Sequence, residues 1–277
     1  MDGVNDAPSL KAANIGVAMG IGGTEVAKDA AEMILVDDNF ITIKNAVMEG
    51  RNLFNNIKKS VLYLLRANFG EVVLMATAIF AGIAAPLSTI QILWVNLMSD
   101  TAPSLALGMD KSSNAVMKEK PRDVNKGLLN KSDYTSIVLQ GIVCGLTALF
   151  AFMLPALYTH GIEGCVDAIK NNPDLLTMCR TYAFSVLTIN ELLMAYVCKD
   201  GNRLAFTYKE CWNNKVLNIT VVACCLMQLA VLTITPLRNM LHLAPCTIKD
   251  IIVIFAVAAA GTIINAILTV VKNRAHN

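Results

Sequence analysis

Six segments of this chain are each long and apolar enough to cross a lipid bilayer. A transmembrane helix needs about 20 predominantly apolar residues, and it must satisfy its backbone polar groups within the helix. The segments lie near residues 60–84, 88–108, 134–158, 180–198, 216–235 and 250–271. Composition agrees, because 55% of all residues are hydrophobic and only 16% are charged. The sequence therefore predicts a mainly α fold, a six-span transmembrane helix bundle whose partner is the lipid bilayer.

Basic residues between the spans predict how the chain is oriented. Residues 109–133 contain six Lys and Arg and residues 199–215 contain four, whereas the intervening loops contain none in 85–87, one in 159–179 and two in 236–249. Because Lys and Arg accumulate in cytoplasmic loops, the two basic loops are expected in the cytoplasm. An even number of spans places both termini on one side, so we predict a multi-pass membrane protein with both termini cytoplasmic. The membrane would be the plasma membrane in a bacterium and an endomembrane in a eukaryote.

Net charge and cysteine spacing exclude two classes of function. A net charge of +2 without clustered basic residues argues against a nucleic-acid partner. The eight cysteines form no CxxC pair and no Cys/His metal spacing, so a zinc or redox site is unsupported. Cys165 and Cys179 both fall in residues 159–179, which are predicted to face outwards, where an oxidising compartment could join them. The sequence leaves open whether they form a disulfide.

The first 50 residues have the alternating pattern of an α/β segment. A helix over 42–59 then continues without a breaker into the first span. Fifty residues are too few to enclose a core of their own, so we expect residues 1–50 to be part of a larger domain. The predicted elements are a strand at 15–19, a turn at 20–23, a helix at 24–33 capped by Thr24, and a strand at 34–36.

A motif rich in oxygen donors, DGVNDAPSLK, occupies residues 2–11. Asp2 and Asp6 place two carboxylates four residues apart on a segment whose Gly and Pro predict a loop. Hard oxygen ligands of this kind suit Mg²⁺ beside a phosphate, and the amide of Asn5 could orient a phosphoryl oxygen. Acidic residues before Pro are also common turn formers, so the spaced pair alone does not decide between a metal site and a turn.

A carboxylate side chain with an amide residue close to it in sequence lies inside the first, the second and the fourth predicted span. An ionisable group at the bilayer centre costs about 2.5 to 3.5 kcal/mol even on the insertion scale, so such groups are candidates for function. Pro103 further breaks the backbone hydrogen bonding beside Asp100, as in transporters that bind ions at mid-membrane. Hydrogen bonding between helices is the alternative, but neutral amides would do that at lower cost. The pattern favours a hard cation held by Asn68 and Glu71, by Asn96, Ser99 and Asp100, and by Glu191.

These motifs resemble regions of one enzyme family. The string DGVNDAPSLKAANIGVAMG at 2–20 resembles the loop of P-type cation-transporting ATPases that holds the catalytic magnesium. The strings NIKKSVLYLLRANFGE at 56–71 and QILWVNLMSD at 91–100 resemble the fifth and sixth spans of type II calcium pumps of the sarco/endoplasmic reticulum and their bacterial relatives. The resemblance implies a C-terminal fragment of such a pump, beginning within the magnesium-binding loop of the phosphorylation domain.

The resemblance also implies a domain organisation. Residues 1–50 would be the C-terminal part of a cytoplasmic, Rossmann-like phosphorylation domain of the haloacid-dehalogenase type, 42–59 a stalk helix, and 60–277 the transmembrane domain. The Asp-Lys-Thr-Gly segment that carries the phosphorylated Asp in this family does not occur in the 277 residues. We therefore expect the fragment to be inactive by itself and to need the missing N-terminal part of the pump, in cis or as a separate chain.

The same resemblance assigns roles to the candidate residues. Asp2, Asn5 and Asp6 would be catalytic, with Asp2 and Asp6 on the Mg²⁺ cofactor and with ATP as the substrate of the complete pump. Ca²⁺ is the expected transported ion, because sodium/potassium pumps carry Asp where this chain has Asn96. Matched position by position, the residues that would hold Ca²⁺ are Asn68, Glu71, Asn96, Ser99, Asp100 and Glu191.

Three alternatives stay open from the sequence alone. Mn²⁺ accepts the same kind of oxygen cage as Ca²⁺. Glu71 and Ser99 favour two ions per cycle, but Arg66 would displace one of them if its side chain turned inward. The third alternative concerns the chain itself, which instead of part of an intact pump would be a non-catalytic membrane protein, half of a split pump, or a truncated gene product with no transport of its own.

Overall fold

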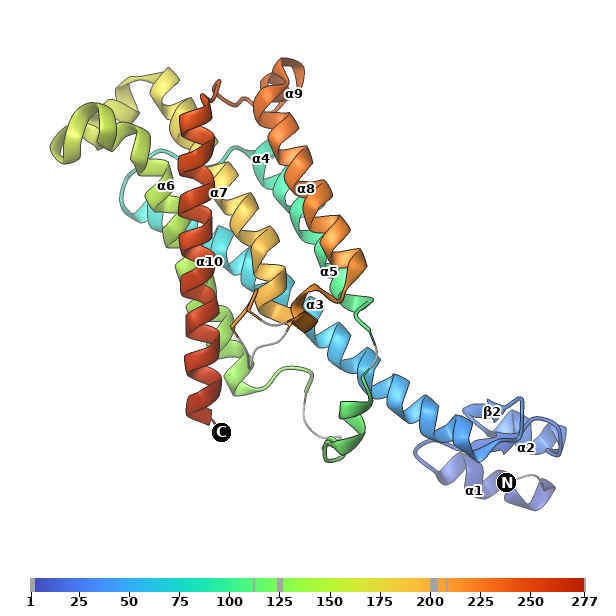
Figure 1. Cartoon of the computed structure of the whole chain (residues 1–277). Helices are drawn as coiled ribbons and strands as arrows, with labels where there is room; N and C mark the ends of the chain where they lie inside the picture. Colours follow the sequence, from blue (N-terminus) through green and yellow to red (C-terminus); the bar gives the residue numbers. More distant parts are fainter. Residues whose placement is uncertain (1–2, 112, 124–126, 200–203, 208, 277) are drawn as a thin grey trace. The chain divides into compact units, whose positions relative to one another are not determined.

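The computed structural model describes residues 3–111, 113–123, 127–199, 204–207 and 209–276 (Figure 1). The chain divides into two compact units. The first consists of Met1–Phe54 and Ser112–Pro121, and the second of Asn55–Lys111 and Arg122–Asn277. Asp2 lies outside the described residues, as do Lys126 and Arg203 of the two basic loops.

The first unit contains a parallel pair of short strands joined by a helix. Strand β1 (Val17–Met19) pairs with β2 (Met33–Leu35), and α2 (Glu25–Ala30) connects them. The hydroxyl of Thr24 accepts a hydrogen bond from the backbone N–H of Ala27 at 3.4 Å, so Thr24 caps this helix as predicted. The predicted order of strand, turn, helix and strand is confirmed.

Two features stabilise the turn after β1: hydrogen bonds to the carboxylate of Asp38, and the close packing of Gly23 against the carbonyl of Met19. Asp38 accepts hydrogen bonds from the backbone N–H groups of Gly20 and Gly22 at 2.6 and 2.7 Å, and from the N–H of the residue between them at 3.0 Å. A Cβ at Gly23 would lie 2.0 Å from the carbonyl oxygen of Met19. Only glycine therefore fits where the chain leaves β1.

The segment that the sequence predicts as a loop at residues 2–11 is helical where the structure describes it. A 3₁₀ turn, η1 (Val4–Asp6), leads directly into α1 (Ala7–Ala12). The carboxylate of Asp6 accepts a hydrogen bond from the N–H of Gly3 at 3.2 Å, and Pro8 sits in the first turn of α1, where an N–H is not needed. The loop prediction was wrong because Gly and Pro here begin a helix.

Helices dominate the second unit and include most of the predicted spans. Among the described residues, five helices are long and apolar enough to cross a membrane, which agrees with a multi-pass membrane protein. Helix α7 lies at the centre of this unit, contacts α6, α8 and α10, and is buried almost throughout (Figure 1). The five are α3 (Phe40–Phe80), α6 (Lys131–Asn171), α7 (Pro173–Lys199), α8 (Lys215–Thr233) and α10 (Ile248–His276).

The second predicted span, 88–108, forms three consecutive segments instead of one regular helix. Helix α4 (Thr89–Trp94) is followed by η2 (Val95–Asp100), which is π-helical, and by α5 (Thr101–Gly108). Pro103 explains part of this, because it cannot donate the backbone hydrogen bond of a regular α-helix. Wider π turns of this kind are common at functional sites.

The segment 159–179, which the sequence predicts as an outward-facing loop, also differs from the prediction, because most of it is helical. Helix α6 continues to Asn171 across a break at Gly161, where φ is 68°, and α7 begins at Pro173. Cys165 and Ile169 are buried in the core, which favours helix here. Cys165 and Cys179 are free thiols, so the disulfide that the sequence left open is not formed.

The remaining described elements are short. Helix α9 (Thr235–Met240) follows α8, and two 3₁₀ segments are η3 (Asn114–Lys118) and η4 (Lys209–Trp212). Within the first unit, Arg51 donates hydrogen bonds to the carbonyls of Val116 and Glu119, both at 2.9 Å. This side chain therefore ties η3 to the first part of α3.

Candidate functional site

The π-helical turn η2 contains three of the predicted residues, Asn96, Ser99 and Asp100. Pro103 has no N–H to donate to the carbonyl of Ser99 four residues earlier. The hydroxyl of Tyr63, on α3, donates to that carbonyl at 2.8 Å. Tyr63 is fully buried, in an apolar cluster with Leu107 and Leu192. One side chain therefore stabilises the irregular turn and fixes it to the neighbouring helix.

Two amide–carboxylate contacts join α3 to η2 at the predicted residues. The amide of Asn96 donates to both carboxylate oxygens of Glu71, at 3.2 and 3.1 Å. The amide of Asn68 donates to Asp100 at 3.4 Å and to the carbonyl of Leu64 at 2.8 Å. The tertiary structure thus brings Asn68, Glu71, Asn96 and Asp100 together from two helices.

Glu191 approaches the same region from α7. Its side chain is 1% exposed, and that of Asp100 is 2% exposed. Both carboxylate oxygens of Glu191, and Oδ1 of Asp100, have no hydrogen-bond partner among the described residues. The carboxylates of Glu191, Asp100 and Glu71 interact electrostatically with one another. Buried acidic oxygens without partners are costly, which indicates that another group compensates them.

The carboxylates do not by themselves form a closed metal cage. Within the part of the chain that the structure describes, no group of three or more His, Cys, Asp or Glu side chains is placed to hold a metal ion. Amide oxygens, the hydroxyl of buried Ser99 and backbone carbonyls would have to contribute. Such mixed oxygen sets are what Ca²⁺ accepts, with six to eight ligands in flexible geometry.

Arg66 does not join these carboxylates. Its side chain is buried, and Nη1 donates to the thiol sulfur of Cys198, on α7, at 3.0 Å. None of the ion pairs between described residues includes Arg66. Among the ion pairs of the described residues, the guanidinium therefore pairs with none of Glu71, Asp100 and Glu191.

The N-terminal motif is described only in part. Asn5 is exposed and Asp6 is partly exposed at η1, whereas Asp2 lies outside the described residues. Asp6 uses one carboxylate oxygen to accept from Gly3. The donors that are described, a carboxylate and an amide at the surface, fit a hard cation such as Mg²⁺ in chemistry.

Sequence reasoning missed Tyr63 as a residue of the site. A phenol inside an apolar span is itself a signal, because a buried tyrosine hydroxyl usually finds a hydrogen-bond partner. It also did not predict that Asn190 is fully buried and that its amide has no hydrogen-bond partner among the described groups. That observation depends on which side chains surround α7, and no local pattern could give it.

Comparisons with known proteins agree on one family. The family model described as cation transporting ATPase, C-terminus, matches residues 84–271. The chain is 40% identical over 273 residues to calcium-transporting ATPase 1 of Bacillus cereus, a match that covers 98% of the chain and 30% of the relative. It is 37% identical over 265 residues to a calcium-transporting ATPase of Bacillus subtilis, a match that covers 96% of the chain and 28% of the relative. A calcium-transporting ATPase of Listeria monocytogenes is 33% identical to the chain over 275 residues, which cover 99% of the chain and 29% of that relative. The chain thus spans about 30% of the length of these curated relatives.

Proposed function

The chain belongs to the cation-transporting ATPase family, in its C-terminal region, and from that premise we propose that it supplies the ion site of a pump that moves Ca²⁺ across a membrane. The relatives are calcium-transporting ATPases by name, which supports Ca²⁺ as the transported substrate. The alternative ion is Mn²⁺, since it accepts the same donors.

The observation that carries this proposal is the set of buried carboxylate oxygens without partners. Glu191 and Asp100 lie on helices of a membrane bundle and interact electrostatically with Glu71. A divalent cation would neutralise this charge and occupy the free oxygens. Asn96 and Asn68 already position Glu71 and Asp100, and the hydroxyl of Ser99 is close in sequence. These six residues are therefore proposed to bind the cation.

The N-terminal unit is proposed to be part of a Rossmann-like phosphorylation domain. Two parallel strands connected by a helix are the repeating unit of such domains, and β1, α2 and β2 have this arrangement. Asp2 and Asp6 would hold Mg²⁺, and Asn5 would orient a phosphoryl group. The Mg²⁺ would neutralise charge on a phosphoryl group that ATP transfers to an aspartate elsewhere in the pump. The rest of the pump is the proposed partner.

A six-span arrangement is proposed for the membrane part. The segments α4, η2 and α5 together run from residue 89 to 108. At about 1.5 Å per residue they would extend about 30 Å, the thickness of the hydrocarbon core. With this segment counted as a span, both termini lie on the side of the basic loops, which we propose to be the cytoplasm. The bacterial relatives favour a plasma membrane.

A chimeric pump tests the proposed function. The C-terminal region of the Bacillus cereus relative is replaced by this chain, and Ca²⁺ uptake is measured in inside-out membrane vesicles with ATP. Glu71→Gln, Asp100→Asn and Glu191→Gln are each expected to abolish uptake, whereas Glu163→Gln, an exposed Glu on α6, should leave it unchanged. Uptake that tolerates Glu191→Gln would contradict the site, and stimulation by Mn²⁺ but not Ca²⁺ would reassign the ion.

A further inference from the structure

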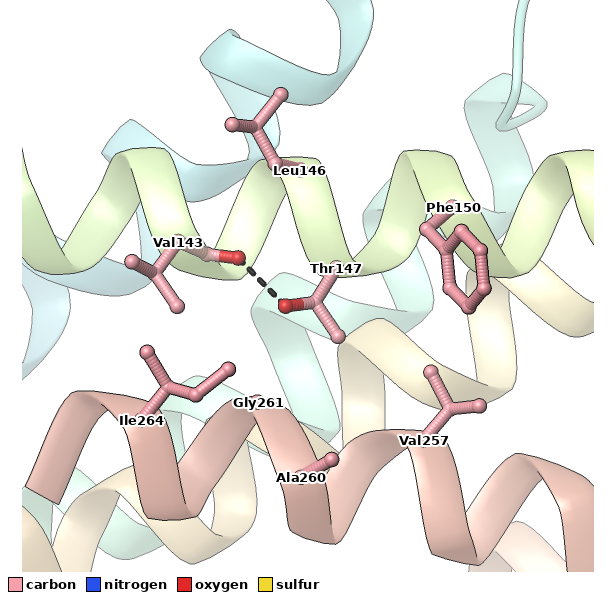
Figure 2. Close-up of a pocket in the computed structure, with 8 residues that line it drawn as sticks. All are labelled: Val143, Leu146, Thr147, Phe150, Val257, Ala260, Gly261 and Ile264. Atoms are coloured by element: carbon pink, nitrogen blue, oxygen red, sulfur yellow. Dashed lines mark hydrogen bonds between the residues drawn. The ribbon is translucent and has the colours of Figure 1, made fainter.

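An apolar groove lies between α6 and α10, with a cavity of about 410 Å³ (Figure 2). Each helix contributes four residues with the spacing i, i+3, i+4 and i+7, so one face of each helix borders the groove. The hydroxyl of Thr147 donates a hydrogen bond to the carbonyl of Val143 at 2.7 Å, so its proton does not need an acceptor from a molecule bound in the groove. The lining residues are Val143, Leu146, Thr147 and Phe150 on α6, and Val257, Ala260, Gly261 and Ile264 on α10.

A lysine lies at one end of the same helix pair. The ammonium group of Lys272, on α10, donates to the carbonyl of Ser132 and to the hydroxyl of Ser136, both on α6. An ammonium group has three N–H donors. Among the residues that the structure describes, these contacts use two of the three donors, so one donor is available to an acceptor from outside the protein.

The surroundings of Lys272 carry an excess of positive charge. None of the ion pairs between residues that the structure describes includes Lys272. Among the described side chains, the charged groups that act on Lys272 electrostatically are Arg66 and Asp133. Asp133 is paired with Lys58 at 2.7 Å, so its charge is already balanced. An anionic group is therefore the complementary ligand for this end of α6 and α10.

The lysine lies further along the same two helices than the residues that line the groove. Ser136 precedes Val143 by seven residues, which is about two turns and returns to the same face about 10 Å further along. Lys272 lies eight residues beyond Ile264, about 12 Å along α10. A cation and an apolar groove at this separation match the phosphate and the acyl chain of a phospholipid, because half of the hydrocarbon core is about 15 Å thick.

We propose that Lys272 and the groove between α6 and α10 form a binding site for one anionic phospholipid. The phosphate accepts a hydrogen bond from Lys272, and one acyl chain lies in the groove against Gly261 and Ala260. Basic positions between transmembrane helices on the cytoplasmic side are suited to anionic headgroups. The assignment to the cytoplasmic leaflet rests on the proposed orientation, whereas the site itself does not depend on which ion is transported.

Lipid titration of the complete 277-residue chain in detergent, followed by native mass spectrometry, tests this proposal. The probes are palmitoyl-oleoyl phosphatidylglycerol and the zwitterionic phosphatidylcholine with the same chains. We expect phosphatidylglycerol to bind more tightly. Lys272→Gln should weaken its binding about fivefold, which corresponds to about 1 kcal/mol for one basic residue near the membrane surface. Lys272→Arg should retain it.

The groove is tested with a substitution that fills it. Ala260→Phe is expected to reduce the binding of both lipids, because the ring occupies the volume of the acyl chain. Ile263→Phe, an exposed position on α10 outside the lining, and Lys249→Gln, at the other end of α10, are the matched controls and should bind as the native chain does. Equal binding of the two lipids by the native chain, or native binding by Lys272→Gln or by Ala260→Phe, would overturn the proposal. Ca²⁺ uptake is not part of this readout, so failure here leaves the proposed transport function untouched.

Discussion

Removing the hydroxyl of Tyr63 tests how the irregular turn η2 is held in place. Tyr63→Phe deletes the hydrogen bond of 2.8 Å to the carbonyl of Ser99 but keeps the ring, so no large cavity forms. Pro103 has no N–H and cannot replace the lost donor. The carbonyl is then left in a buried region without the phenol, next to Asp100.

The expected cost is about 1 to 2 kcal/mol in the free energy of unfolding. A buried acceptor that loses its partner costs about 1 to 3 kcal/mol in soluble proteins, whereas hydrogen bonds in membrane proteins average about 0.6 and reach about 1.7 kcal/mol. We expect a value in the upper part of the range for membrane proteins, because Pro103 has no N–H that could donate to the carbonyl of Ser99 in place of the phenol.

Denaturation of the chain in mixed micelles, followed by helical circular dichroism, measures this change. Tyr158→Phe is the matched control, because Tyr158 is 74% exposed and its hydroxyl should contribute little. If Tyr63→Phe unfolds at the same denaturant concentration as Tyr158→Phe, the hydroxyl does not stabilise η2. Protection of the chain by Ca²⁺ should also weaken in Tyr63→Phe, since the same turn carries Asp100.

Three further predictions concern other parts of the chain. Glu191→Gln should stabilise the ion-free chain by removing a buried carboxylate without a partner and should abolish the stabilisation by Ca²⁺, as measured by thermal denaturation with and without the ion. Hydrogen bonds from the backbone N–H groups of Ile21, Gly22 and Gly20 lower the pKa of Asp38 below 3.8. The turn should therefore be fully stabilised above pH 3.8 and lose this contribution as the pH falls through the lowered pKa; Asp38→Ala should remove the dependence in amide hydrogen exchange. Gly261→Ala should destabilise the contact between α7 and α10, because a Cβ would lie 2.4 Å from Nδ2 of Asn190.

Controls for these three predictions come from nearby positions. Glu163→Gln should change neither stability nor its response to Ca²⁺. Asp37→Ala, next to Asp38, should leave the exchange of the Gly20 and Gly22 amides unchanged, because the carboxylate of Asp37 accepts from Asn39 and Thr42 instead. Gly50→Ala should be harmless, since no atom lies within 4 Å of its Cβ position. A Gly261→Ala chain as stable as Gly50→Ala would show that α7 and α10 are not closely packed there.

Local patterns predicted regular elements well and irregular ones poorly. Thr24 as a cap and the strands on either side of α2 were predicted because their signals lie within a few neighbouring residues. The helical structure of most of residues 159–179 was missed because a window of about 20 apolar residues detects spans and not shorter buried helical segments. The irregular backbone beside Asp100 was predicted from Pro103, but the π-helical form of η2 was not.

For the candidate site, the residue types were predictable and their contacts were not. Acidic and amide side chains inside apolar segments are visible in the sequence, because their cost in lipid makes them exceptional. The sequence could not say that Asn96 binds Glu71, that Asn68 reaches Asp100, or that Tyr63 holds the carbonyl of Ser99. It also left the orientation of Arg66 open, and in the structure its guanidinium donates to the thiol of Cys198.

By itself, the sequence determined that the chain enters a membrane and which oxygen donors enter with it. These properties depend on hydrophobicity and residue type along short stretches, since the bilayer acts on each segment separately. Only the tertiary structure decided which donors meet, which carboxylate oxygens lack partners, and that Lys272 contacts the helix that lines one side of an apolar groove. Those facts depend on the packing of helices that are far apart in sequence, where the position of each side chain is set by its neighbours in space.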